Sequence, residues 1–137
     1  MPSEGLALNL KYRGENDEYT AYSYLDIGRL CDSLGKYHES LEFFTKSSNI
    51  FYNLFGEDSH QTGLTYNAIG MIHHRVGNFA EAEEKFNKSS RIIKKILGED
   101  NRLTAESYAC LGRLYKDQGK CPESLECLNK FLQIMTN

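Results

Sequence analysis

A stretch of 42 residues occurs three times in this chain, and the repetition restricts the possible folds more than any other feature. The copies begin at Thr20, Thr62 and Thr104, 42 residues apart, so the register holds without insertions. Self-similarity at a fixed period of about 20 to 50 residues is typical of proteins that stack one small unit repeatedly. We therefore expect a single repeat domain over residues 1–137. The predicted repeats span 20–61, 62–103 and 104–137.

Each copy predicts a pair of helices joined by a tight turn. In the middle copy, side chains recur at three- and four-residue steps, the pattern of one buried helical face. That face carries Tyr66, Ile69, Ile72, His73 and Val76. A second predicted helix places Phe79, Ala82, Phe86, Ser89, Ile92, Ile93 and Ile96 on its inner side. Between the two lies Gly77, which can take the left-handed conformation that ends many helices.

The connections between copies carry their own signals. Gly56 and Gly98 are expected to end the second helices, and an aspartate follows each glycine by two residues. A short polar side chain can accept hydrogen bonds from the first amides of the next helix. We therefore predict that Asp58, Asp100 and, for the first copy, Asn16 are helix N-caps.

A glycine also lies inside the first helix of every copy. An interior glycine costs roughly 1 kcal/mol relative to alanine, so three in one register indicate a close approach between helices. The expected contacts pair Gly28 with Ser40, Gly70 with Ala82 and Gly112 with Ser124.

The two ends of the chain are expected to be apolar. Leu8, Leu10 and Tyr12 predict the tail of a partial helix at about residues 4–13, and Leu132, Ile134 and Met135 close the other end. No polar capping helix follows the third copy, although solenoids usually need one for solubility. The chain is therefore interpreted as a piece of a longer array, or its ends associate.

The repeats resemble the tetratricopeptide repeat family. The resemblance rests on an aromatic residue followed at fixed spacing by an aliphatic residue and glycine, on the turns near Gly35 and Gly77, and on Ala82 and Phe86. The first pattern occurs as Tyr24-x-x-Ile27-Gly28, Tyr66-x-x-Ile69-Gly70 and Tyr108-x-x-Leu111-Gly112. The usual repeat has 34 residues, and the longer period here is similar to that of kinesin light chains and Leu-Gly-Asn-repeat spindle proteins. The resemblance implies an all-α, right-handed solenoid of antiparallel helix pairs.

The resemblance also implies a concave groove, lined by the first helices, that binds peptides or protein segments. By position, the groove would contain Tyr22, Leu25, Asp26, Arg29, Leu64, Asn67, Met71, His74, Arg75, Arg113 and Lys116. Asp32, Ser33, Ala68, Glu106, Ala109, Cys110 and Asp117 occupy further inner-facing positions.

Composition excludes several classes of function. A net charge of −3 lacks the basic excess of nucleic-acid binders, and the apolar runs are too short for a bilayer span. The four cysteines show neither metal-site nor disulfide spacing, which favours reduced thiols in the cytoplasm. Adjacent His73 and His74 diverge by about 100° on a helix and cannot grip one metal unaided. No catalytic, metal or cofactor motif is found, so the protein is not expected to be an enzyme.

The leading hypothesis is a protein-interaction scaffold. Arg29, Met71 and Arg113 occupy the same inner position in successive copies. They favour an extended ligand with acidic and apolar or aromatic residues. Two alternatives stay open: end-to-end self-association of a structural segment, and a regulatory domain attached to an enzyme.

Overall fold

The computed structural model describes residues 16–136, and within that range it is entirely helical apart from the turns. The helices are α2 (Glu18–Ser33), α3 (Tyr37–Phe55), α4 (His60–Arg75), α5 (Phe79–Leu97), α6 (Arg102–Asp117) and α7 (Cys121–Met135). The partial helix expected near residues 4–13, with Leu8, Leu10 and Tyr12, lies outside the described residues.

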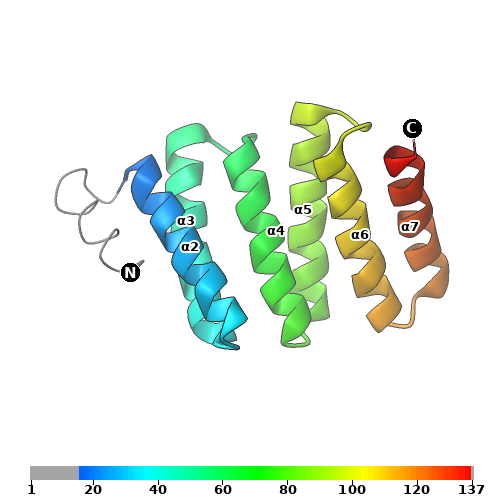
Figure 1. Ribbon diagram of the computed structural model, residues 1–137, viewed down its shortest axis with the longest axis horizontal. Helices are drawn as coiled ribbons and strands as arrows, with labels where there is room; N and C mark the ends of the chain where they lie inside the picture. Colours follow the sequence, from blue (N-terminus) through cyan, green and yellow to red (C-terminus); the bar gives the residue numbers. More distant parts are fainter. Residues whose placement is uncertain (1–15, 137) are drawn as a thin grey trace.

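The helices form three antiparallel pairs that stack side by side. The first helices begin at Glu18, His60 and Arg102, 42 residues apart, and the second helices begin at Tyr37, Phe79 and Cys121 with the same spacing. Each second helix packs on its own partner, and α3 and α5 also pack on the first helix of the next pair. Figure 1 shows the resulting row, with α2 at one end and α7 at the other. The predicted all-α solenoid is confirmed.

The turn within each pair depends on a glycine in the left-handed region. Gly35 has φ +76°, which a residue with a side chain rarely adopts. The amide of Lys36 then donates to the carbonyl oxygen of Cys31 at 2.8 Å, the long bond of a Schellman motif. The turns at Gly77 and Gly119 repeat this arrangement.

The helix N-caps lie one residue later than the sequence predicted. The caps are Asp17, Ser59 and Asn101, whose side chains accept from backbone amides of the first turn. The predicted caps were Asn16, Asp58 and Asp100. Asp58 reaches Lys95 instead, with Oδ2 and Nζ 2.5 Å apart. The helix therefore begins after the aspartate, and the next polar side chain fills the cap position.

Two core clusters lie between a pair and the first helix of the next pair, and a third, of Ala21, Ile50 and Phe51, lies between α2 and α3. One cluster contains Leu25, Phe44, Ile69 and Ile72. The next contains Ala82, Phe86, Leu111 and Leu114. Val76 and Ile96 were predicted to be buried but are exposed. Both lie at the end of a helix, Val76 as the C-cap of α4 and Ile96 as the penultimate residue of α5.

The interior glycines lie at close contacts between the two helices of a pair. Ser40 Oγ donates to the carbonyl oxygen of Gly28 at 2.7 Å, and Ser124 Oγ donates to that of Gly112 at 2.8 Å. A Cβ at Gly28 would lie 2.6 Å from the ring of Phe44. The predicted facing residues are therefore correct, while an aromatic or leucine side chain on the second helix fills the space above each glycine.

Candidate functional site

A continuous depression runs between α4 and α6, and we refer to it as the α4–α6 trough. It consists of a pocket of about 350 Å³ and a neighbouring pocket of about 440 Å³, which share Met71, Cys110 and Arg113. The smaller pocket is also lined by His74, Arg75, Phe86 and Asp117. The larger one adds Asn67, Arg102, Glu106, Ala109, Phe131 and Met135.

The middle of the trough is apolar. Phe86, a buried residue of α5, faces the smaller pocket, and the partly buried side chains of Met71 and Cys110 lie on either side. Burial raises the pKa of the Cys110 thiol above its ordinary value, so the protonated form is favoured at neutral pH. Cys110 therefore contributes polarizable apolar surface here rather than a reactive thiolate.

Asn67 places an unused hydrogen-bond acceptor in the larger pocket. Its Oδ1 is buried and has no hydrogen-bond partner among the described residues. Its Nδ2 makes a long contact of 3.9 Å with the sulfur of Met71, and the Asn67 side chain also interacts with the Cys110 thiol. A buried acceptor without a partner costs free energy, and a donor on a bound chain would recover that cost.

Most charged side chains of the trough already have a partner of opposite charge. His74 Nε2 lies 2.6 Å from Asp117 Oδ2, which joins α4 to α6. Arg75 Nε lies 3.1 Å from Asp32 Oδ1, which joins α4 to α2. Arg102 lies 3.6 Å from Glu106 on its own helix. The His74–Asp117 and Arg75–Asp32 pairs join neighbouring first helices, and all three pairs reduce the free positive charge that the sequence suggested.

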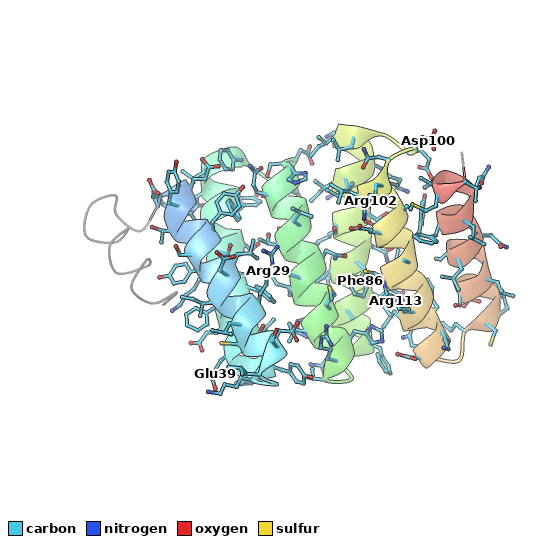
Figure 2. The ribbon with its side chains drawn as sticks, viewed as in Figure 1. Arg29, Glu39, Phe86, Asp100, Arg102 and Arg113 are labelled. Atoms are coloured by element: carbon cyan, nitrogen blue, oxygen red, sulfur yellow. The ribbon has the colours of Figure 1, made fainter. Side chains whose placement is uncertain are left out.

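Arg113 is the exception among the basic residues of the trough. Its guanidinium has no carboxylate partner within the described chain, and its Nε donates to the backbone oxygen of Ala109 at 3.3 Å. Figure 2 shows Arg113 on α6 and Arg29 on α2. Arg29 is exposed, and it lies 3.7 Å from Asp26 on the same helix.

The predicted groove residues of α2 are placed differently. Tyr22 packs edge-on against the ring of Phe51, with centroids 5.0 Å apart, and remains partly accessible. Leu25 is buried in the core beside Phe44 and Ile69, so it cannot face a ligand as expected. Leu25 holds the sequence position that Asn67 holds one repeat later, and as an apolar side chain it fills the space between α2 and α4.

The remaining predicted residues divide into two groups. Asn67, Met71, His74, Arg75 and Arg113 line the α4–α6 trough together. Leu64 is half-buried on α4, and Lys116 is exposed on α6; neither lines the two pockets of the trough.

Sequence reasoning did not assign Phe86, Arg102 and Phe131 to the site. Phe86 was expected only in the core, yet it also forms part of the pocket wall. Residues of the second helices can be found from sequence only when the spacing between neighbouring first helices is known.

The part of the chain that the structure covers contains no helix long and apolar enough to cross a membrane. Among those same residues, no group of three or more His, Cys, Asp or Glu side chains could hold a metal ion.

Three solved structures are similar to this chain over nearly its whole length. BtubC (BKLC) from P. vanneervenii has a TM-score of 0.90 at 17% identity and covers 98% of this chain. A putative kinesin light chain from Podosopora anserina, with nearly identical TPR-like repeats, has a TM-score of 0.79 at 18% identity over 98% of this chain. A point variant of the same P. anserina protein has a TM-score of 0.81 at 18% identity over 97%.

These structures are longer than this chain. The chain spans 54% of BtubC, 64% of the P. anserina protein and 63% of its variant. At such low identity the likeness establishes the shared solenoid fold. Comparison with curated proteins gives no match.

The family is shown by the sequence itself. The family model for the tetratricopeptide repeat matches residues 33–92 and again residues 61–137, which together cover most of the chain. The expected resemblance is thereby confirmed: this chain belongs to the tetratricopeptide repeat family.

Proposed function

We propose that the protein is a non-catalytic scaffold that binds an extended segment of another protein in the α4–α6 trough. Repeats of this family generally mediate protein–protein interactions. The observation that carries the proposal is the trough itself, with an apolar centre at Met71, Phe86 and Cys110 between polar groups at both ends. Ligand sites commonly combine an apolar lining with a few polar groups that fix orientation.

The trough favours a ligand with one apolar or aromatic side chain next to an acidic group. The apolar centre would take the side chain, and Arg113 would meet the acidic group because no carboxylate of the described chain occupies it. Asn67 lines the larger pocket, and its amide, whose Oδ1 is buried without a partner among the described residues, would turn toward the ligand to accept from a backbone N–H. Since the other basic residues are already paired, one acidic residue suits the site better than an acidic run.

The proposed compartment is the cytoplasm. Cys31, Cys110, Cys121 and Cys127 are all free thiols. Unpaired cysteines are usual where the environment is reducing.

The proposal can be tested with peptides selected on the protein from a random displayed library. Fluorescence anisotropy then measures each selected peptide against wild type, Arg113→Glu and Met71→Glu. Reversal of the Arg113 charge is expected to weaken peptides that carry the acidic residue by at least about tenfold. A charge at Met71 is expected to weaken all peptides, because it would be desolvated in the apolar centre.

A matched control separates trough binding from general electrostatics. Lys36→Glu changes the net charge by the same amount as Arg113→Glu, but Lys36 lies at the turn between α2 and α3. Peptides that bind Arg113→Glu as tightly as wild type, or that respond equally to Lys36→Glu, would overturn the proposed site. Arg29→Glu in the same assay shows whether the ligand extends onto α2.

A further inference from the structure

A second depression lies on the other side of α4 from the trough, and we refer to it as the outer groove. It has a volume of about 420 Å³ and is walled by α3 and α5, with side chains of α4 as its floor. Figure 1 shows α4 between these two helices. The residues that line the outer groove fall between positions 41 and 85. None of them lines the α4–α6 trough.

The outer groove is open because two of its side chains are smaller than their counterparts one repeat later. Thr45 and His73 line it, and the residues 42 positions later are Asn87 and Tyr115. Tyr115 packs against the core cluster around Phe86, and its side chain also interacts with that of Asn87. His73 Nδ1, in contrast, is buried and has no hydrogen-bond partner among the described residues. A threonine and a histidine therefore leave part of this space to a ligand.

Lys85 supplies a positive charge that no described carboxylate neutralises. It is half-buried on α5, and its Nζ lies 5.1 Å from the centroid of the Tyr66 ring. It forms no salt bridge with the described residues, whereas Lys88, one turn further on, pairs with Glu84 at 3.4 Å. Lysine is rarely buried without a partner of opposite charge. The outer groove therefore favours an anionic group on its ligand.

The ring that Lys85 covers also carries a hydrogen-bond donor. In the following repeat the equivalent hydroxyl, that of Tyr108, donates to Glu99. Glu57, the counterpart of Glu99, pairs instead with Arg91 at 3.0 Å, and the Tyr66 hydroxyl forms no hydrogen bond with a described side chain. Burial raises the pKa of Tyr66 above its ordinary value of 10.0, so its hydroxyl is protonated and can donate at neutral pH.

Apolar side chains lie beside these polar groups. Ile69 of α4 is buried, Leu41 of α3 is half-buried, and both line the outer groove. Tyr52 also lines it and is 48% exposed. Tyrosine is enriched among the residues that dominate binding at protein interfaces. The groove therefore matches a protein segment better than a small anion, which would leave its apolar floor uncovered.

We infer that the outer groove is a second binding site, for a protein segment that carries a carboxylate next to an aliphatic or aromatic side chain. The carboxylate accepts charge-assisted hydrogen bonds from Lys85 Nζ and the Tyr66 hydroxyl, and the apolar side chain covers Leu41 and Ile69. Among the described residues that line the groove, Lys85 is the one lysine or arginine, which favours a singly charged carboxylate over a phosphate. With the trough on the other side of α4, one chain would hold two partner segments at once.

Peptides from a random displayed library test this site when they are selected on a protein whose trough is blocked by Met71→Glu and Arg113→Glu, after circular dichroism has verified its fold. The selected peptides are expected to carry an aspartate or glutamate close to an apolar residue. Fluorescence anisotropy on otherwise wild-type protein should show that Lys85→Gln weakens them at least about fivefold. Lys36→Gln, at the turn between α2 and α3, is the matched control and should change affinity less than about twofold. A selection without such peptides, or peptides insensitive to Lys85→Gln, would overturn the inference.

A change in the peptide identifies the group that meets Lys85. Replacement of the acidic residue by glutamine should weaken binding to wild type at least about fivefold, but binding to Lys85→Gln at most about twofold, because that contact is already lost. Tyr66→Phe keeps the ring under Lys85 and should weaken the acidic peptide about two- to fivefold. Equal losses on wild type and Lys85→Gln would place the acidic residue elsewhere. A phosphoserine peptide that binds at least about tenfold tighter would show that the ligand is a phosphate and that the carboxylate assignment is wrong.

Filling the outer groove tests its shape independently of its charge. Thr45→Asn combined with His73→Tyr introduces the pair found at Asn87 and Tyr115, so the helices are expected to pack as they do one repeat later. Peptides of the outer groove should bind this variant at least about tenfold more weakly, because the added side chains occupy their space. Peptides selected for the trough should keep their affinity, which separates this site from the trough. Undiminished binding of outer-groove peptides to the folded double variant would exclude the groove.

Discussion

At the scale of single residues, the three repeats differ in whether a serine hydroxyl donates to the carbonyl oxygen of the glycine inside the first helix. Ser40 and Ser124 donate to the carbonyl oxygens of Gly28 and Gly112. The middle repeat has Ala82 at this position, facing Gly70 without a hydroxyl. Helices in all three pairs approach closely, but two of the contacts carry an additional buried hydrogen bond.

Removal of that hydrogen bond is expected to reduce stability. Ser40→Ala and Ser124→Ala should each lower the free energy of unfolding by about 0.5 to 1.5 kcal/mol, because the glycine oxygen retains its helical partner. Ala82→Ser should raise it by a smaller amount. Urea denaturation measures all three, with exposed Ser33→Ala as a control. A neutral result for both alanine variants would show that the hydroxyls contribute little net energy.

The buried amide of Asn67 allows stability and binding to be separated. Asn67→Ala removes an acceptor that has no partner in the free protein, so the free energy of unfolding should change by less than about 1 kcal/mol. The same change should weaken a selected trough peptide about five- to tenfold, since the ligand amide loses its acceptor. Anisotropy and urea denaturation provide the two readings. A large loss of stability with unchanged affinity would contradict the assigned role.

Sequence reasoning assigned the wrong position or role to residues whose side chains could contact more than one neighbour. Position within the repeat put Leu25 in the groove, yet its apolar side chain gains more by packing against Ile69 and Phe44. All three caps lie one residue after the predicted position, where Asp17, Ser59 and Asn101 also offer a polar side chain, and only at Asp58 does a competing partner, Lys95 on α5, accompany the shift. Repeat periodicity shows which face of a helix a residue occupies, but not which neighbouring side chain competes for it.

At the scale of helices, the α3–α4 connection is tied to α5 by ion pairs. Asp58 accepts from Lys95, and Glu57 accepts from Arg91 at 3.0 Å. The hydrogen bond from Lys95 holds the pKa of Asp58 below its ordinary value of 3.8. The counterparts Glu99 and Asp100 form no such salt bridges within the described residues.

This pair predicts a specific acid dependence of stability. Because the folded-state pKa of Asp58 is lowered, its contribution is present above pH 3.8 and is lost as the pH falls through the folded-state value. Wild type should therefore be more stable than Asp58→Asn at about pH 7, and the difference should disappear in acid. Thermal unfolding from about pH 7 to about pH 2 measures it. Asp100→Asn, whose carboxylate lacks a salt-bridge partner among the described residues, should show no comparable convergence.

The helix pairs of the described chain were predicted almost completely from the sequence. Helical periodicity and the glycines at 35, 77 and 119 defined the helix pairs, since those glycines adopt positive φ. The residues of the candidate site were predicted less completely. Five of the predicted groove residues and four of the further inner-facing residues line the α4–α6 trough, but Phe86 belongs to it as well. Its participation depends on the spacing between α4 and α6, which the His74–Asp117 pair helps to set.

At the scale of the whole molecule, stability should vary along the stack. In a linear array each pair is stabilised only by its neighbours, so helices covered on both sides should open least often. α4 and α5 have several buried residues each, whereas α7 has Ser124 as its one buried residue. The end of the stack near α7 should therefore open at a lower free energy than the middle.

Hydrogen exchange followed by mass spectrometry can test this gradient. In dilute solution, amides of α7 are expected to exchange at least about tenfold faster than those of α4 and α5, because the outer face of α7 is uncovered. Uniform protection from α4 to α7 in dilute protein would mean that the stack unfolds as one cooperative unit, and the graded stability expected from its end faces would be wrong.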